Sequence, residues 1–365
     1  MNLMRIKILD RYFIKQFLQT TIFGLIGFVV IFIVIDAMEN LDDFIDQNVP
    51  IIRVLHYYLV FTPEIIRLMT PVAVLFAALF TVGKAANLSE MTAIKASGVS
   101  LFRFMIPFLI TSIFISIFSV YFGGYIVPLA NKNKIKIEQI YLKKSFYYAQ
   151  SNIFFQDSKT RIVNIAFYDV DNKVANQVSI QEFLADDLTI MKNRIDAAFL
   201  NYDSTKKHWY AEKGVQREFF DNYETAEYFE KKVIEGLNFL PDDLSKKQQK
   251  VPEMNLSELK DLINSQKRAG NDPSAILIDY YSIFAFATTN LIVVLFALPI
   301  STNKRKGGLA AQIGINILVT FLYLVFMKVS QAFGKNGSLS PILTAWFANL
   351  IFLVAAIFNL IRSRL

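Results

Sequence analysis

The chain has 365 residues, of which 54% are apolar, 34 are phenylalanine and only 19% are charged, so we expect a membrane protein rather than a soluble domain. Its formal charge of +7 comes from dispersed Lys and Arg that form no RNP-like, zinc-finger or basic-region pattern, which argues against nucleic-acid binding. The chain contains no Cys, which excludes disulfides, thiolate metal sites and cysteine nucleophiles.

Six apolar runs predict membrane-spanning helices, because a bilayer core of about 30 Å requires about 20 apolar helical residues. They are residues 17–35, 68–82 with an outward extension through 57–66, 104–127, 276–300, 309–329 and 342–361. The first run follows basic residues, as in a signal peptide, but it is too long and no small-residue cleavage site follows. We therefore interpret it as a retained anchor. We prefer six spans to the alternative in which two of the runs are buried helices of a soluble fold.

Basic residues predict the orientation, because Lys and Arg concentrate in short cytoplasmic loops. In this chain they precede the first span, follow the sixth, and lie between spans two and three and spans four and five: Arg5, Lys7, Arg11, Lys15, Lys84, Lys95, Arg103, Lys304, Arg305, Lys306, Arg362 and Arg364. The loop after the first span instead carries Glu39, Asp42, Asp43 and Asp46. We therefore expect a multi-pass protein with both termini in the cytoplasm.

A polar insert between the third and fourth spans is then expected on the extracytoplasmic side. Its strand-like stretches, which alternate or carry β-branched and aromatic residues, are 152–155, 161–169, 177–183, 195–203, 208–220 and 232–239. Turn-forming clusters separate them, at 171–172, 203–205 and 221–222, as expected of an antiparallel sandwich or jelly roll. Residues 132–143 and 255–268 are predicted to be helical connectors.

The expected fold is thus an α-helical membrane protein with six transmembrane helices in a 3+3 arrangement and an inserted extracytoplasmic all-β, jelly-roll-like domain. The predicted domains are residues 1–128 with the first three spans, 129–272 with the β domain and its connectors, and 273–365 with the last three spans.

No catalytic constellation is visible in the sequence. Neither His56 nor His208 lies in a zinc-binding spacing, and the chain has no G-x-x-x-x-G-K-[ST] stretch with which to bind ATP. We therefore predict a chain that is not an enzyme and binds no metal or cofactor, so that any ATP energy must come from a partner.

The stretch NLSEMTAIKASGVS, residues 87–100, separates the second predicted span from the third. Asn87 or Ser89 can cap a helix, Glu90 would lie in its first turn, where the helix dipole favours a carboxylate, and the Ser-Gly pair at 97–98 is a helix stop. Apolar residues recur at helical spacing, at Leu88, Met91 and Ile94. We therefore predict a short amphipathic helix over residues 88–98 in a cytoplasmic loop.

Two interpretations of this helix remain open. It can lie flat on the membrane surface, or it can place its polar face in a groove of a cytosolic partner. The carboxylate of Glu90 slightly favours a basic partner, because anionic lipid would repel it.

The order of these parts and several stretches resemble the lipopolysaccharide-export permeases LptF and LptG, the membrane subunits of an ABC transporter. The similar stretches are ILDRYFIKQFL from Ile8, TPEIIRLMTPVAVLFAALFTVGK from Thr62, LSEMTAIKASGVSLFR from Leu88, GGYIVPLANK from Gly123, MNLSELKDLINSQKRAG from Met254, FALPISTNKRKGG from Phe296 and SQAFGKNGSLSPILTAWFANLIFL from Ser330. The resemblance covers nearly the whole chain, is weakest in the β domain, and fits the LptG type somewhat better than the LptF type.

The resemblance implies that the helix at 88–98 couples the permease to an LptB-type ATPase dimer, in which ATP and Mg²⁺ would be bound. The residues expected to carry this coupling are Ser89, Glu90, Met91, Ile94, Lys95, Ser97 and Gly98. Further implied partners are a second LptF/LptG-type subunit, LptC and a periplasmic LptA-type bridge. The implied substrate is lipopolysaccharide, and the implied location is the bacterial inner membrane, with the β domain in the periplasm.

The resemblance also implies a lipid cavity between two permease subunits, lined by the first, second and fifth spans. In the relatives, lysines near the outer end of the first span hold lipid phosphates, but this chain carries the acidic stretch AMENLDDF from Ala37 there. The residues expected to contact substrate are the cations Arg67 and Lys328 and the aromatic residues Phe28, Phe32 and Phe321. The alternatives are an ion pair of Arg67 with Glu64 and simple snorkelling of Lys328.

The favoured function is therefore a permease that extracts lipopolysaccharide with the energy of a partner ATPase. The alternative is a membrane-anchored coupling or signalling protein whose β domain binds a periplasmic protein. An ion-coupled transporter is disfavoured because no predicted span centre carries a convincing ionisable residue.

Overall fold

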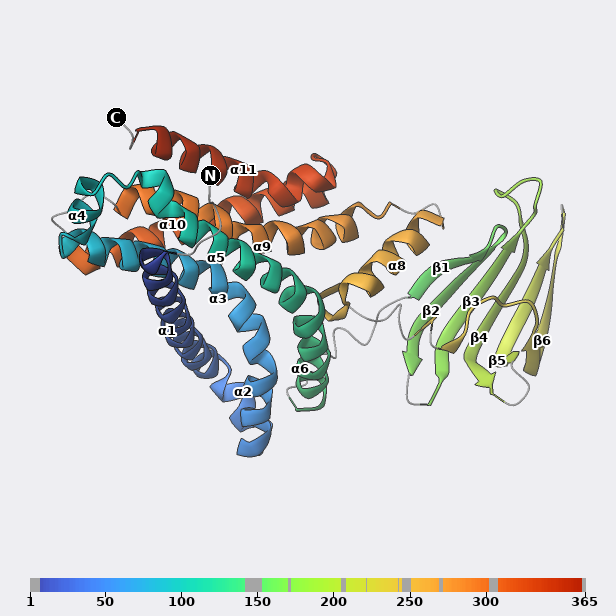
Figure 1. Ribbon diagram of the computed structural model, residues 1–365. Coiled ribbons are helices and arrows are strands. Elements are labelled where there is room, and N and C mark those ends of the chain that lie inside the picture. The colour runs from blue at the N-terminus through green and yellow to red at the C-terminus, as the bar shows by residue number, and fades with distance from the viewer. Residues whose placement is uncertain are drawn as a thin grey trace. The chain divides into compact units, whose positions relative to one another are not determined.

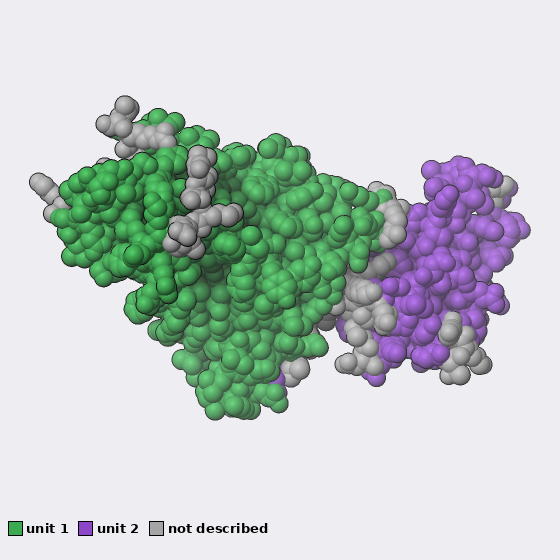
Figure 2. Space-filling model, in the orientation of Figure 1, with its two compact units in different colours: residues 1–137, 251–267, 271–365 green, residues 138–250, 268–270 purple. Residues whose placement is uncertain are grey.

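The computed structural model describes residues 7–141, 153–169, 172–204, 208–220, 222–241, 243–244, 251–268, 272–301 and 308–362. The chain divides into two compact units (Figure 2): a helical unit of residues 1–137, 251–267 and 271–365, and a β unit of residues 138–250 and 268–270. The predicted domain limits at 128 and 272 differ from this division, because most of both connector helices groups with the helical unit.

Within the described residues, six helices are long and apolar enough to cross a membrane, and each overlaps one predicted run. They are α1 (Ile8–Glu39), α3 (Ile51–Asn87), α5 (Leu101–Tyr121), α9 (Ser274–Ser301), α10 (Gly308–Lys335) and α11 (Pro341–Arg362). The third run, 104–127, continues beyond α5 through residue 127. The other helices are longer than their runs because polar residues continue them at both ends. The 37 residues of α3 extend about 55 Å at about 1.5 Å per residue, so this helix must project beyond a bilayer core.

Both predicted connectors are helical. α5 continues through the π-helical turn η1 (Phe122–Ile126) into α6 (Val127–Tyr141), and α8 covers Leu256–Arg268. Asn255 caps α8: its Oδ1 accepts the Glu258 N–H at 3.0 Å, while the Asn255 N–H donates to Glu258 Oε2 at 2.8 Å. Lys132 Nζ lies 3.0 Å from Glu258 Oε1, so an ion pair joins α6 to α8. Figure 1 shows these two helices at the opposite end of the helical unit from α4 (Glu90–Ala96).

The centre of the helical unit is formed by α3 and α9. In each of them, 56% of the most apolar stretch is buried, against 17% in α1 and 22% in α10. α1 and α10 therefore expose most of their apolar surface, which lipid or another apolar partner must cover in a membrane. The short helix α2 (Leu41–Asp46) follows α1 and packs through the ring of Phe44 against Tyr57.

A buried polar network joins the last three helices. The hydroxyls of Thr289 and Tyr323 lie 2.6 Å apart, and Tyr323 donates to Asn349 Oδ1 at 3.1 Å. Asn349 Nδ2 in turn donates to the Ala285 carbonyl at 2.6 Å. Because a buried polar group without a partner is costly, these bonds fix the register of α9, α10 and α11.

Gly334 in α10 packs directly on α11, where a Cβ at this position would lie 2.7 Å from Thr344 Cβ. We therefore expect Gly334→Ala to destabilise the helical unit by about 1–3 kcal/mol, because one of the two helices must move away. The matched control is Gly314→Ala in the same helix, where a Cβ meets no atom within 4 Å. Thermal unfolding in detergent would measure both variants. Equal unfolding midpoints for Gly334→Ala and Gly314→Ala would contradict this packing of α10 on α11.

The β unit contains one antiparallel sheet, which confirms the predicted all-β insert. Its strands are β1 (Ile153–Ser158), β2 (Arg161–Asp169), β3 (Val174–Phe183), β4 (Met191–Asp203), β5 (His208–Phe219) and β6 (Glu224–Ile234). Their order in the sheet follows the chain (Figure 1). A jelly roll has two sheets and Greek-key connections, whereas the described strands form a single meander.

The last strand differs most from its prediction. β6 begins eight positions before the predicted 232 and ends at Ile234, because it is an edge strand whose side chains are mostly exposed. An exposed strand needs no apolar alternation, so the sequence carries no strand pattern there. Among the predicted turn residues, Asp171, Thr205 and Asp221 lie outside the described residues, as do Asn152 of the first predicted strand and residues 142–143 of the first connector.

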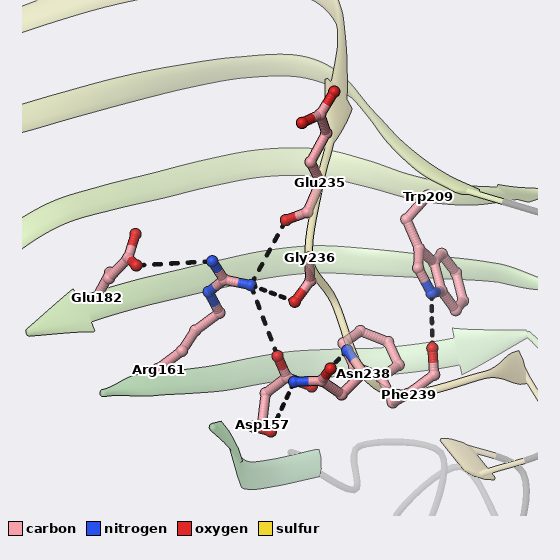
Figure 3. A network of polar contacts seen from close by, with 8 residues as sticks. All are labelled: Asp157, Arg161, Glu182, Trp209, Glu235, Gly236, Asn238 and Phe239. Carbon is pink, nitrogen blue, oxygen red and sulfur yellow. Dashed lines mark hydrogen bonds and ion pairs between the residues drawn. The ribbon is translucent and has the colours of Figure 1, made fainter. Parts of the chain in front are cut away.

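Residues 235–239, which we call the strap, run from β6 back to β1 and β2 (Figure 3). Arg161 Nη1 donates to the Gly236 carbonyl at 2.7 Å, and the Asn238 N–H donates to Asp157 Oδ1 at 2.9 Å. Trp209 Nε1 donates to the Phe239 carbonyl at 2.9 Å. Because Phe239 is buried, the strap contributes to the core of the β unit.

Candidate functional site

The segment between α3 and α5 forms the helix α4, as predicted, over Glu90–Ala96. Its first boundary is Ser89, which has φ +62°, a left-handed conformation that is uncommon outside glycine. The predicted capping hydrogen bond is absent there, because Ser89 lacks the extended backbone of an ordinary N-cap. The second boundary is Gly98 at φ +79°. Its N–H donates to the Lys95 carbonyl at 3.0 Å, and the Val99 N–H donates to the Ile94 carbonyl at 3.3 Å.

α4 is attached to the helical core by two of its apolar side chains. Met91 is only 3% exposed, and Ile94 packs against the same core cluster. Leu88, predicted on this face, is 60% exposed, because it belongs to the turn before Ser89 and not to the helix. α4 is therefore held to the helical core through one face.

The other predicted coupling residues lie on the outside of α4. Ser89, Lys95, Ser97 and Gly98 are exposed, and Glu90 is partly exposed. The Glu90 carboxylate makes no hydrogen bond or ion pair with any residue that the structure describes. The structure thus separates the predicted set into two anchoring side chains and an outward group with one carboxylate and one ammonium.

An ion pair that the sequence does not reveal joins α1 to α5, the helix that follows α4 in the chain. Arg103, in the first turn of α5, donates from Nη1 to Asp10 Oδ1 at 2.8 Å and from Nη2 to Asp10 Oδ2 at 2.6 Å. Asp10 lies in the first turn of α1, and the Lys7 N–H also donates to its Oδ2, at 3.0 Å. The partners are 93 residues apart, so no local spacing signals the pair.

Arg67 forms the ion pair with Glu64 that the sequence offers as its alternative role. Its Nε and Nη2 donate to the two carboxylate oxygens at 3.0 and 2.6 Å. Arg67 also packs on Gly123, where an added Cβ would lie 3.2 Å from Arg67 Cδ, and its guanidinium lies 5.7 Å from the Phe286 ring centroid.

Arg67 lines an apolar cavity of about 210 Å³ between α1, α3, α5 and α9. The cavity lining also includes Asn290, whose Nδ2 donates to Ser119 Oγ at 3.1 Å. Asn290 is buried and its Oδ1 has no hydrogen-bond partner among the described residues. The cavity therefore combines apolar walls with the polar residues Arg67 and Asn290.

The other predicted substrate residues do not line this cavity. Phe28 and Phe32 pack on α3, with ring centroids 5.9 Å from Phe76 and 6.2 Å from Phe61. Phe321 and Lys328 are exposed on α10. Of the five residues, only Arg67 lies at an enclosed site, and the rest face α3 or the outside of α10.

A second hollow, of about 620 Å³, lies over strands β3 to β6 of the β unit. Polar and apolar side chains both line it, including Lys213 and Tyr228. Among the described residues, no group of three or more His, Asp or Glu side chains could hold a metal ion.

A family model for the lipopolysaccharide export system permease LptF/LptG matches residues 11–362. The chain belongs to the LptF/LptG family. The match extends over both units and includes α4, the Arg67 cavity and the sheet. No curated protein matches the chain.

Membership of the LptF/LptG family gives this chain the role of a permease in lipopolysaccharide export, and its six apolar helices are those of a multi-pass membrane protein. The one family description covers both LptF and LptG, so the preference for the LptG type stays a prediction.

Proposed function

We propose that this LptF/LptG permease extracts lipopolysaccharide from the inner membrane and passes it to a periplasmic bridge, driven by ATP hydrolysis in a partner. ATP and Mg²⁺ would be bound by an LptB-type ATPase dimer and not by this chain. A second LptF/LptG-type subunit, LptC and an LptA-type bridge would complete the system. Both termini would lie in the cytoplasm and the β unit in the periplasm.

The observation that carries this proposal is the construction of α4. A helix that receives force must be rigidly attached on one side and accessible on the other. Met91 and Ile94 supply the attachment, while Glu90 and Lys95 face outward. A push on that outward face would therefore reach α3 and α5, which flank α4 in the chain.

The energetics of lipid extraction support an external energy source. Each methylene taken from the bilayer into water costs about 0.8 kcal/mol. Binding to the protein alone therefore cannot supply the free energy needed to extract a lipid with several acyl chains. In the helical unit, α4 lies at one end, and the connectors α6 and α8 lie at the other (Figure 1). Lipid transfer driven from the cytoplasm would require such a separation between the site that receives force and the connectors to the β unit. The weakly buried α1 and α10 are the candidate surfaces for the second permease subunit.

We further propose that Arg67 contacts a phosphate of the lipid head group at the mouth of the apolar cavity. In a complex reconstituted into liposomes, added lipopolysaccharide should raise ATP hydrolysis, and Arg67→Gln should reduce that rise by about 10-fold, since a charge-assisted contact is worth about 1.5–3 kcal/mol. The matched control is Glu64→Gln, which breaks the same ion pair but leaves the guanidinium free to bind.

The two variants separate the two roles of Arg67. If the ion pair alone matters, both variants should reduce the stimulation equally. If Arg67 binds phosphate, Glu64→Gln should retain the stimulation of ATP hydrolysis by lipopolysaccharide. ATP hydrolysis that depends on Glu90 but does not respond to lipopolysaccharide would instead favour a coupling or signalling protein.

A further inference from the structure

We propose that the Asp10–Arg103 ion pair is the joint through which movement of α4 reaches α1. The proposal rests on the proposed function, because it takes α4 as the site where the ATPase acts. Asp10 and Arg103 are positioning residues in this account and contact neither ATP nor lipid.

The chain between α4 and the ion pair is short and well defined. α4 ends at Ala96, Ser97 and the left-handed Gly98 follow it, and α5 begins at Leu101. Ser100 caps α5 by accepting the Arg103 N–H at 3.3 Å. Arg103 therefore lies in the first turn of α5, which four residues, 97–100, separate from the end of α4. Backbone hydrogen bonds tie these four residues to the two helices, so a displacement of α4 would be passed to Arg103.

The ion pair can fix orientation as well as distance. Two parallel hydrogen bonds, at 2.8 and 2.6 Å, hold the guanidinium plane against the carboxylate plane. The Asp10 side chain is only 12% exposed, so water competes weakly for its oxygens. A lysine would keep the charge but lose the paired geometry.

The neighbouring contacts between α1 and α5 are aromatic. Phe13 lies against Phe104 and Phe108, with ring centroids 5.0 and 5.7 Å apart, and Phe17 lies 5.4 Å from Phe108. Apolar contacts are non-directional and allow helices to slide, whereas a bidentate ion pair does not. The phenylalanines thus hold the two helices together, and the ion pair sets their register.

α1 is the helix best placed to respond to such a joint. Only 17% of its most apolar stretch is buried, against 56% in α3 and α9, so less packing resists its movement than holds those two helices. Farther along the same two helices, Leu18 and Ile22 of α1 face the 210 Å³ cavity together with Ile115 and Phe118 of α5. A change in the angle between α1 and α5 at the joint therefore changes the width of that cavity.

The experiment uses the complete complex in liposomes that contain lipopolysaccharide and measures ATP hydrolysis and lipid release together. Arg103→Lys and Asp10→Asn should leave ATP hydrolysis within about 2-fold of the native rate and lower the lipid released per ATP by about 10-fold, within the usual range of coupling between sites. The double variant Asp10→Arg with Arg103→Asp should recover most of that loss. The matched control is Arg11→Gln, a neighbouring exposed cation of α1, which should behave like the native protein.

Because the chain has no cysteine, a second test does not depend on the ion pair. In Asp10→Cys with Arg103→Cys, a short bifunctional thiosulfonate should restore the lipid released per ATP, and reduction should abolish it. This arm distinguishes a mechanical link from a requirement for the two charges.

The outcomes separate this proposal from the proposed function. A parallel fall of ATP hydrolysis and lipid release in the single variants would overturn the joint, because it would indicate a general structural role. Native lipid release per ATP in those variants, alongside loss of coupling in Glu90→Arg, would overturn the joint alone. Native behaviour of the Glu90 variant as well would overturn the coupling role of α4 itself.

Discussion

Replacing Glu90 by Arg should weaken attachment of the ATPase and reduce lipid release. The carboxylate lies in the first turn of α4, is partly exposed and has no partner among the described residues, so a basic groove of the ATPase can pair with it. Reversing the charge places like charges together at that contact and should weaken attachment of the ATPase by about 30-fold or more, since a broken interfacial charge pair costs about 2–5 kcal/mol. Lipid release by the reconstituted complex should fall at least as far.

Two further variants give this prediction its controls. Glu90→Gln removes the charge without reversing it and should have an intermediate effect. Glu39→Arg makes the same reversal at the last residue of α1, far in the chain from α4, and should leave attachment unchanged. Co-purification of the ATPase and lipid release are the two measurements. An attached ATPase and undiminished lipid release in Glu90→Arg would falsify the coupling role.

Trp209→Ala should unfold the β unit while leaving the helical unit folded. The indole is 2% exposed, packs against the rings of Tyr202 and Phe239 at about 5 Å, and donates to the strap (Figure 3). Removing it leaves a large cavity and an unpaired carbonyl, at a cost of about 3–5 kcal/mol. This cost approaches the whole stability of a small domain.

Limited proteolysis of the full chain in detergent would detect this loss, because cleavage should become rapid between residues 153 and 244 only. Trp209→Phe keeps most of the ring packing and should lose only the hydrogen bond to Phe239, about 1 kcal/mol. Tyr228→Ala, at an aromatic residue that is 83% exposed, should resist protease like the native chain. Resistance of Trp209→Ala would show that the strap does not depend on the indole.

The predicted membrane helices are confirmed because an apolar run of sufficient length is a property of composition and needs no knowledge of neighbours. Strand β2 has the predicted bounds, Arg161–Asp169, because fully buried side chains alternate with less buried ones along much of its length. β6 lacks such an alternation, and its position depends on pairing with β5.

The contacts at the candidate sites also divide into those that local spacing predicts and those that depend on tertiary packing. The pair of Glu64 with Arg67 follows from a spacing of three residues on one helix. The exposure of Leu88 could not be predicted from helical periodicity, because the left-handed Ser89 precedes a helix that starts at Glu90, two residues after the predicted start. Asp10 and Arg103 meet only through the packing of α1 on α5, and sequence spacing carries no information on that contact.

The return of the strap to β1 determines how the sheet carries mechanical load. Asn238 is bonded to Asp157, so the chain leaves the sheet beside its first strand rather than at β6. Tension between the two attachments of the β unit would therefore pass through these short contacts and would not peel the sheet apart from its far edge. A force applied through these two attachments would therefore leave β6 unstressed.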